Sequence, residues 1–121
     1  MNFRDKRHRH RFFEMWVRFG GRKPGFTAAI YLPASSDDLW SRTRRCVTSN
    51  GGLDFSLTRI RGISVLQYTI YMAARDFYEE TDNVSLFSLT SSDAISRREI
   101  NLIETAVMIR RDCLTTVRKL M

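Results

Sequence analysis

The sequence predicts an all-α fold: a compact bundle of about five helices in a single domain spanning residues 1–121. Apolar residues recur at intervals of three and four over residues 63–79 and 96–119, the spacing of one buried helix face. Residues 6–19 are amphipathic with the same period. Only residues 84–89 alternate as a strand would, and a lone strand is improbable. We expect a short turn packed on the core there, with a short extended segment as the alternative.

The first helix is expected over residues 6–19. Asp5 is a good N-cap because its carboxylate can accept hydrogen bonds from the amides of the first turn. The pair Gly20-Gly21 suits the left-handed conformation that ends many helices. At about 100° per residue, one side of this helix carries apolar side chains, namely Phe12, Met15, Trp16 and Phe19. The opposite side carries Arg7, Arg11 and Arg18, extended by Arg4 if the helix begins a turn earlier. We therefore expect the arginines to face water.

Two short helices are expected next. Residues 26–32 form a short apolar run closed by Pro33, and its paired alanines favour a tightly packed helix over a strand. Ser35, with Asp38 three residues later, matches a capping box and predicts the start of the following helix. The inner face of that helix would carry Leu39, Trp40 and Cys46.

The middle of the chain combines a loop with a core helix. Residues 49–52 (Ser-Asn-Gly-Gly) are typical of a loop, and residues 53–62 fit either irregular chain or a short helix. The core helix is expected over residues 63–79 and should end at Thr81-Asp82-Asn83.

The last helix is expected over residues 96–119. Ser96-Arg97-Arg98-Glu99 matches a capping box, although Ser92 could begin the helix a turn earlier. Its apolar stripe would run through Ile100, Ile103, Val107, Cys113 or Leu114, Val117 and Met121. A helix of this length could protrude from a small domain and pair with a second copy, although packing on its own domain is favoured.

Composition narrows the class of protein. The apolar and charged fractions, 43% and 27%, are those of a globular domain and not of a disordered chain. No stretch approaches the 18 apolar residues of a membrane span, and the charged N-terminus does not resemble a signal peptide. Two distant cysteines, Cys46 and Cys113, are expected to be buried reduced thiols. These features favour a cytoplasmic protein with no membrane association.

Positive charge is concentrated at the N-terminus. Residues 1–25 carry eight basic and two acidic side chains, and so hold six of the seven excess positive charges. Arginines along one helix face can neutralise phosphates. The candidate residues for binding a polyanion or a partner are Arg4, Arg7, Arg11, Arg18, Arg22 and Lys23. The alternative is a solvated face, or one paired with the acidic residues Asp76, Glu79, Glu80 and Asp82.

The sequence offers little support for catalysis or metal binding. His8 and His10 lie two residues apart, and on a helix they point in nearly opposite directions, so they cannot share an ion. We expect His8 at the edge of the core, donating a hydrogen bond that fixes the first helix. Neither glycine pair matches a nucleotide-binding loop. We therefore predict no catalytic residue, no metal and no cofactor.

Several stretches together resemble a known family. They are Phe3-x4-His8-Arg9-x2-Phe12, then Ala28-Ala29-Ile30-Tyr31-Leu32, then Leu66-Gln67-Tyr68 with Ala73-Ala74, and finally Ile109-Arg110-Arg111-Asp112-x-Leu114. Their order is similar to that in a small family of uncharacterised bacterial proteins, mostly from Gram-positive bacteria and their mobile elements, which is known as a domain of unknown function. The resemblance spans residues 3–114 and implies an all-helical fold, with no catalytic residue, cofactor or substrate to transfer. The arginines of residues 4–11 depart from the family pattern.

Three functions follow as hypotheses. The first is a non-enzymatic binding or regulatory protein with a protein partner, of the kind that phages and other mobile elements encode. The alternative is a nucleic-acid-binding module that uses Arg4, Arg7, Arg11 and Arg18. The third is a homodimer formed through the C-terminal helix.

Overall fold

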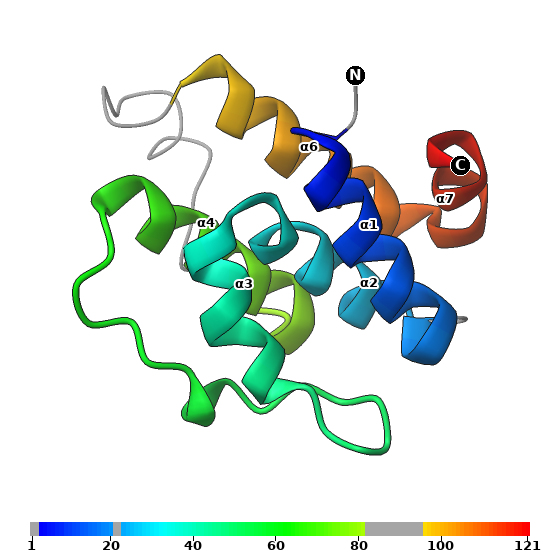
Figure 1. Cartoon of the computed structure of the whole chain (residues 1–121). Coiled ribbons are helices and arrows are strands. Elements are labelled where there is room, and N and C mark those ends of the chain that lie inside the picture. The colour runs from blue at the N-terminus through cyan, green and yellow to red at the C-terminus, as the bar shows by residue number, and fades with distance from the viewer. Residues whose placement is uncertain (1–2, 21–22, 82–95) are drawn as a thin grey trace.

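The computed structural model describes residues 3–20, 23–81 and 96–121, and this part of the chain is all-helical, with six α-helices and no β-strand (Figure 1). The helices are α1 (Lys6–Met15), α2 (Pro24–Tyr31), α3 (Asp37–Thr43), α4 (Val65–Glu79), α6 (Arg97–Arg111) and α7 (Cys113–Leu120). The all-α prediction is confirmed. The expectations for residues 84–89, for Ser92 and for Arg22 lie outside the described residues.

Helix α2 occupies the centre of the fold. Residues 26–31 are all buried, and α1, α4 and α6 each pack against this helix. Ala28 and Ala29 are fully buried, so that the neighbouring helices can approach the α2 backbone closely. The short apolar run is therefore a tightly packed helix, as its paired alanines predicted, whereas its place at the centre of the fold was not predicted.

Helix α1 begins where the sequence predicts. The Asp5 carboxylate accepts a hydrogen bond from the His8 amide at 2.8 Å, which satisfies one of the free N–H groups of the first turn. The helix widens into a π-helical turn over Trp16–Gly20. Phe12 and Met15 are buried, and Trp16 and Phe19 are partly buried against the core.

Helix α3 begins one residue later than predicted. Ser36, not Ser35, is the N-cap, and its hydroxyl accepts a hydrogen bond from the Leu39 amide at 3.3 Å. The chain continues past α2 in a 3₁₀ turn, Pro33–Ser35, and the Ser35 hydroxyl donates to the Leu32 carbonyl at 2.6 Å. Leu39, Trp40 and Cys46 are buried as expected.

A long connection joins α3 to α4. It contains 3₁₀ turns at Arg44–Cys46 and Phe55–Leu57, and the predicted loop at residues 49–52 is closed by an isolated bridge between Val47 and Leu53. Gly51 sits in this loop at φ +82°, a conformation that favours glycine. Apart from that single turn, residues 53–62 are irregular, which was one of the two alternatives.

Helix α4 supplies the second central surface. It starts at Val65, two residues later than predicted, because the Ser64 hydroxyl caps it by accepting from the Gln67 amide at 3.1 Å. Ile70, Ala73 and Ala74 are buried, and the helix ends with Glu80 in the left-handed conformation at φ 58°.

The prediction of one continuous helix over residues 96–119 is wrong. The backbone breaks at Asp112 (φ −133°, ψ 65°), so that α6 and α7 are separate helices. Across the break, the Thr116 hydroxyl donates to the Met108 carbonyl at 3.1 Å. The buried side chains are Leu102, Ile103, Ala106 and Ile109 on α6, and Cys113, Val117 and Leu120 on α7.

The ends of this segment also differ from the prediction. Val107 and Met121, which the predicted stripe placed on the inner face, are exposed. At the start of α6, the Ser96 hydroxyl donates to the Glu99 carboxylate and does not cap a backbone amide, so the two residues of the predicted box pair with each other and the Ser96 cap is not formed.

The two cysteines are buried and free, as predicted. Burial raises the pKa of the Cys46 thiol, whose sulfur lies 2.7 Å from the Thr58 hydroxyl. A thiol held in its neutral form is a poor nucleophile, which agrees with a packing role.

Candidate polyanion-binding surface

Three of the predicted arginines converge on the segment that joins α2 to α3. Arg7 donates to the Asp37 carboxylate at 3.1 Å, and Arg11 binds the other oxygen of the same carboxylate. Arg11 also donates to the Ala34 carbonyl at 3.2 Å, and Arg4 donates to the Ser35 carbonyl at 3.3 Å. Asp37 and the last carbonyls of the 3₁₀ turn therefore accept hydrogen bonds from the arginine side chains at the start of the chain.

The expectation that all these arginines face water is wrong for Arg11, whose side chain is only 18% exposed. Arg7 remains 73% exposed although it is paired. The hydrogen bond from Arg11 lowers the pKa of Asp37, which stays ionised and offsets part of the positive charge. Two members of the predicted acidic cluster bind other arginines, since Glu79 binds Arg75 and Glu80 binds Arg110, and Asp82 of that cluster lies outside the described residues.

Of the remaining predicted residues that the structure describes, Arg18 and Lys23 do not join this group. The Arg18 guanidinium lies 5.3 Å from the centre of the Phe19 ring, at the other end of the helix. The Lys23 ammonium donates to the carbonyls of Asn50 and Gly51, both at 3.2 Å. The predicted set is therefore spread over separate surfaces.

His8 has the structural role that the sequence predicted. Its ring is fully buried, its Nδ1 accepts from the Arg4 amide at 3.0 Å, and its Nε2 donates to the Tyr31 carbonyl at 2.7 Å. Burial lowers the pKa of His8 to about 4, so the ring is neutral at pH 7. Both ring nitrogens are occupied, so neither can bind a metal. Over the described ranges, no cluster of three or more metal-binding side chains occurs.

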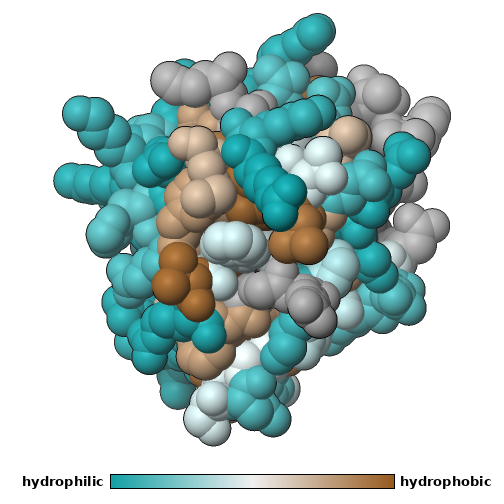
Figure 2. Space-filling model, turned by 90° about the vertical axis from the view of Figure 1, so that its right-hand side faces the viewer, coloured by the Kyte–Doolittle hydropathy of each residue, from teal (hydrophilic) through white to brown (hydrophobic). Residues whose placement is uncertain are grey.

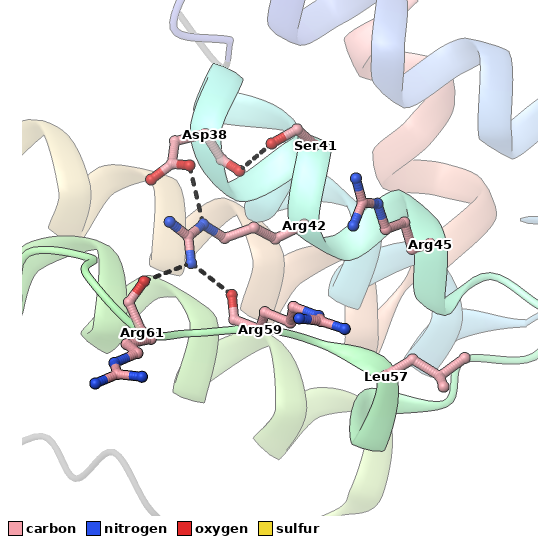
Figure 3. Close-up of a pocket in the computed structure, with 7 residues that line it drawn as sticks. All are labelled: Asp38, Ser41, Arg42, Arg45, Leu57, Arg59 and Arg61. Carbon is pink, nitrogen blue, oxygen red and sulfur yellow. Dashed lines mark hydrogen bonds and ion pairs between the residues drawn. The ribbon is translucent and has the colours of Figure 1, made fainter.

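A second basic surface, which the sequence did not predict, lies between α3 and the irregular chain that follows it (Figure 3). It is a pocket of about 370 Å³. Its lining residues are Asp38, Ser41, Arg42, Arg45, Leu57, Arg59 and Arg61. We call it the arginine pocket.

Arg42 holds the two walls of the arginine pocket together. Its Nε donates to the Asp38 carboxylate at 2.9 Å, one turn earlier on α3. Its Nη1 donates to the carbonyls of Arg59 and Arg61, at 2.6 and 2.9 Å (Figure 3). One guanidinium thus satisfies two backbone acceptors of a segment that has no secondary structure of its own.

The arginine pocket carries uncompensated charge. Four arginines and one aspartate line it, an excess of three positive charges, and the aspartate is already paired with Arg42. Among the residues that the structure describes, Arg45, Arg59 and Arg61 form no salt bridge. Leu57, which is 54% exposed, adds an apolar wall. Such a pocket can bind an anion through charge-assisted hydrogen bonds.

A local signal for these arginines was present in the sequence. Arg59 and Arg61 flank Ile60, which packs partly against the core, and in extended chain the two neighbours of an inward side chain point outward. Residues 53–62 as a whole have neither a helical nor a strand period, so the sequence did not predict that Arg59 and Arg61 share one exposed side. That this segment faces Arg45 across a pocket depends on the tertiary fold.

A second pocket of about 370 Å³ lies near the start of α2 and the loop at residues 49–52. Its basic residues are already engaged: Lys23 binds two loop carbonyls, and Arg110 binds Glu80 at 2.8 Å. It therefore offers an anion less free charge than the arginine pocket does.

Comparison with known protein families, with curated proteins and with solved structures finds no match. The resemblance to the family of uncharacterised bacterial proteins therefore stays a prediction. In the described part of the chain, every helix is too short or too polar to cross a lipid bilayer.

Proposed function

We propose that this chain is a non-enzymatic binding protein whose ligand is a nucleic acid. The observation that carries the proposal is the arginine pocket, which Arg45, Arg59 and Arg61 line without forming a salt bridge to any described carboxylate. A chain with a net charge of +7 and a pI near 10.1 attracts polyanions over its whole surface. Binding at one place requires several basic side chains that can each contact a phosphate, and the arginines of the pocket can provide these contacts.

The surface that a bound nucleic acid would contact extends beyond the arginine pocket. Asp37 and Asp38 are adjacent in the first turn of α3, and they bind Arg7 on one side and Arg42 on the other. The exposed Arg7 guanidinium therefore lies near the start of α3, where Asp38 borders the arginine pocket. An extended polyanion could contact both, whereas a single small anion could not.

Binding of fluorescently labelled RNA and DNA, followed by anisotropy at several salt concentrations, tests the proposal. Contacts to three or four phosphates predict a slope of log K against log salt of about −3. The double variant Arg45→Glu/Arg59→Glu should weaken binding by more than about tenfold. A matched control is Arg118→Glu/Lys119→Glu, which makes the same charge change at exposed positions of α7, on the other side of the molecule in Figure 1.

Two results would contradict the proposal. One is the absence of binding to either nucleic acid at low ionic strength. The other is an equal loss of affinity in the pocket variant and in the α7 control, because net charge alone would then explain the binding.

A protein partner, including a second copy of this chain, is the second candidate, and exposed apolar side chains favour it. They are Val107 and Met108 on α6, and Leu114 and Met121 in and after α7. Figure 2, which faces the side where α7 lies, shows apolar side chains set among hydrophilic ones. Light scattering tests the homodimer: Leu114→Glu should shift a dimer to a monomer, and a wild-type chain that stays monomeric at high concentration would refute it.

The remaining proposals concern context. The buried free thiols of Cys46 and Cys113 suit a reducing compartment, and on that ground we place the protein in the cytoplasm. We also retain the proposals of a single compact domain and of a protein encoded by a phage or another mobile element. Mass spectrometry of alkylated protein recovered from its native host would test the compartment, because a disulfide would argue against it.

A further inference from the structure

We infer that the arginine pocket receives one nucleotide of a single-stranded nucleic acid. This inference rests on the proposed function and specifies its ligand. It follows from the shape of the pocket, from the way its walls are built, and from the chemistry of its lining.

The shape favours an unpaired strand. The pocket is a hollow of about 370 Å³ between α3 and residues 57–61. A duplex presents convex backbones with its bases stacked inside, so it can touch the rim of such a hollow but cannot enter it. An unpaired nucleotide can be turned out of the strand and inserted into a pocket.

The construction of the walls argues against reading of a duplex groove by α3. A recognition helix must lie in the major groove with its contacting face free. The face of α3 that carries Arg42 is covered instead by irregular chain, because Arg42 donates to the carbonyls of Arg59 and Arg61 at 2.6 and 2.9 Å. These hydrogen bonds tie the covering segment to the helix and keep the pocket concave.

The lining suits a phosphate and its neighbouring base. Arg45 projects from the 3₁₀ turn that follows α3, and Arg59 lies on the irregular chain of the opposite wall, so a phosphate between them could accept from both guanidinium groups (Figure 3). Guanidinium planes also stack on unpaired bases. The exposed Leu57 side chain offers an apolar contact to a base or sugar.

The lining also predicts the kind of specificity. No aromatic ring and no carboxamide lines the pocket, so it lacks both the rings that stack on base faces and the amide groups that hydrogen-bond to base edges. Binding should therefore depend on the backbone and tolerate different sequences. A phosphorylated peptide could present the same phosphate chemistry, but the net charge of +7 favours a ligand with many phosphates.

The experiment compares three labelled probes with the full chain at one salt concentration. They are a single strand of about 12 nucleotides, a hairpin duplex with the same number of phosphates, and a phosphoserine peptide. The single strand should bind at least about tenfold more tightly than the hairpin and the peptide. Arg59→Gln should reduce this preference, whereas Arg118→Gln should leave it unchanged, with both variants checked for folding by circular dichroism.

Each outcome decides one point. Equal affinity for single strand and hairpin would overturn the inference while the proposed function stands. Tighter binding of the phosphopeptide would overturn both in favour of a protein ligand. If neither nucleic acid binds at low salt, the proposed function itself fails. A preference that survives Arg59→Gln would show that the single strand binds elsewhere.

Discussion

Acid should destabilise this protein through one buried side chain, His8. Its ring donates to the Tyr31 carbonyl and accepts from the Arg4 amide, and both contacts require the neutral form with a proton on Nε2. Burial, opposed by the Tyr31 carbonyl and by Asp5, lowers the pKa of His8 from 6.5 to about 4. The unfolded chain therefore binds a proton at His8 more readily than the folded chain does.

The sign and size of the effect follow from this difference. Because the pKa is depressed in the folded state, the contribution of His8 to stability is complete above pH 6.5 and is lost as the pH falls toward 4. Each pKa unit corresponds to about 1.4 kcal/mol, so the free energy of unfolding should fall by about 3 kcal/mol across this window. Asp37 also has a lowered pKa, but its ordinary value of 3.8 places its effect below the window.

Urea denaturation at a series of pH values measures the effect. The wild-type chain should lose stability steadily between pH 6.5 and 4, whereas His8→Asn should be less stable at pH 7 and lack this slope. His10→Gln is the control, because His10 is exposed beside Glu14. NMR titration of the wild-type chain gives an independent readout. A His8 pKa near 6.5, or an unchanged slope in His8→Asn, would refute the reasoning.

Further predictions concern the arginines and the turns. Asp37→Asn should raise polyanion affinity in the anisotropy assay, because it frees Arg7 from its carboxylate; unchanged affinity would place the ligand away from this face. Arg42→Ala should lower the free energy of unfolding by about 1.5–3 kcal/mol in urea melts, because two carbonyls lose a charged donor; a loss below about 0.5 kcal/mol would contradict its bracing role. Gly51→Ala should destabilise by more than Gly62→Ala. Both glycines have φ near +80°, where an alanine costs about 1–2 kcal/mol, but only at Gly51 would the new methyl group crowd its neighbours: it would displace the Lys23 ammonium, 2.8 Å away, from its loop carbonyls and press on the Phe19 ring at 3.3 Å. Equal decreases in the melting temperature of the two variants would contradict this reasoning.

Elements that depend on near neighbours were predicted well. Asp5 caps α1 because its carboxylate needs only an amide three residues away. Helix α2 follows from an apolar run with small residues, and α4 from apolar spacing at three and four. The burial of His8 was anticipated as a core-edge position, although the structure buries it completely.

Elements that depend on packing were predicted less well. The break at Asp112 leaves the apolar spacing almost intact, so residues 96–119 look like one helix in the sequence. After the break, Cys113, Val117 and Leu120 are buried, whereas Met121 is exposed. The shift of the α3 cap from Ser35 to Ser36 has a similar origin, because the chain adds a 3₁₀ turn before it leaves α2.

The sequence by itself determined the helical class of this protein, the helix in its most apolar run and its excess of positive charge, because those properties are sums over local residues. Only the tertiary structure decided which charges remain free. Asp37 lies 26 residues beyond Arg11 and neutralises part of the predicted face, whereas Arg45 and Arg59 line one pocket and form no salt bridge there. Electrostatic interaction depends on distance in space, and the chain brings remote residues together only when it packs.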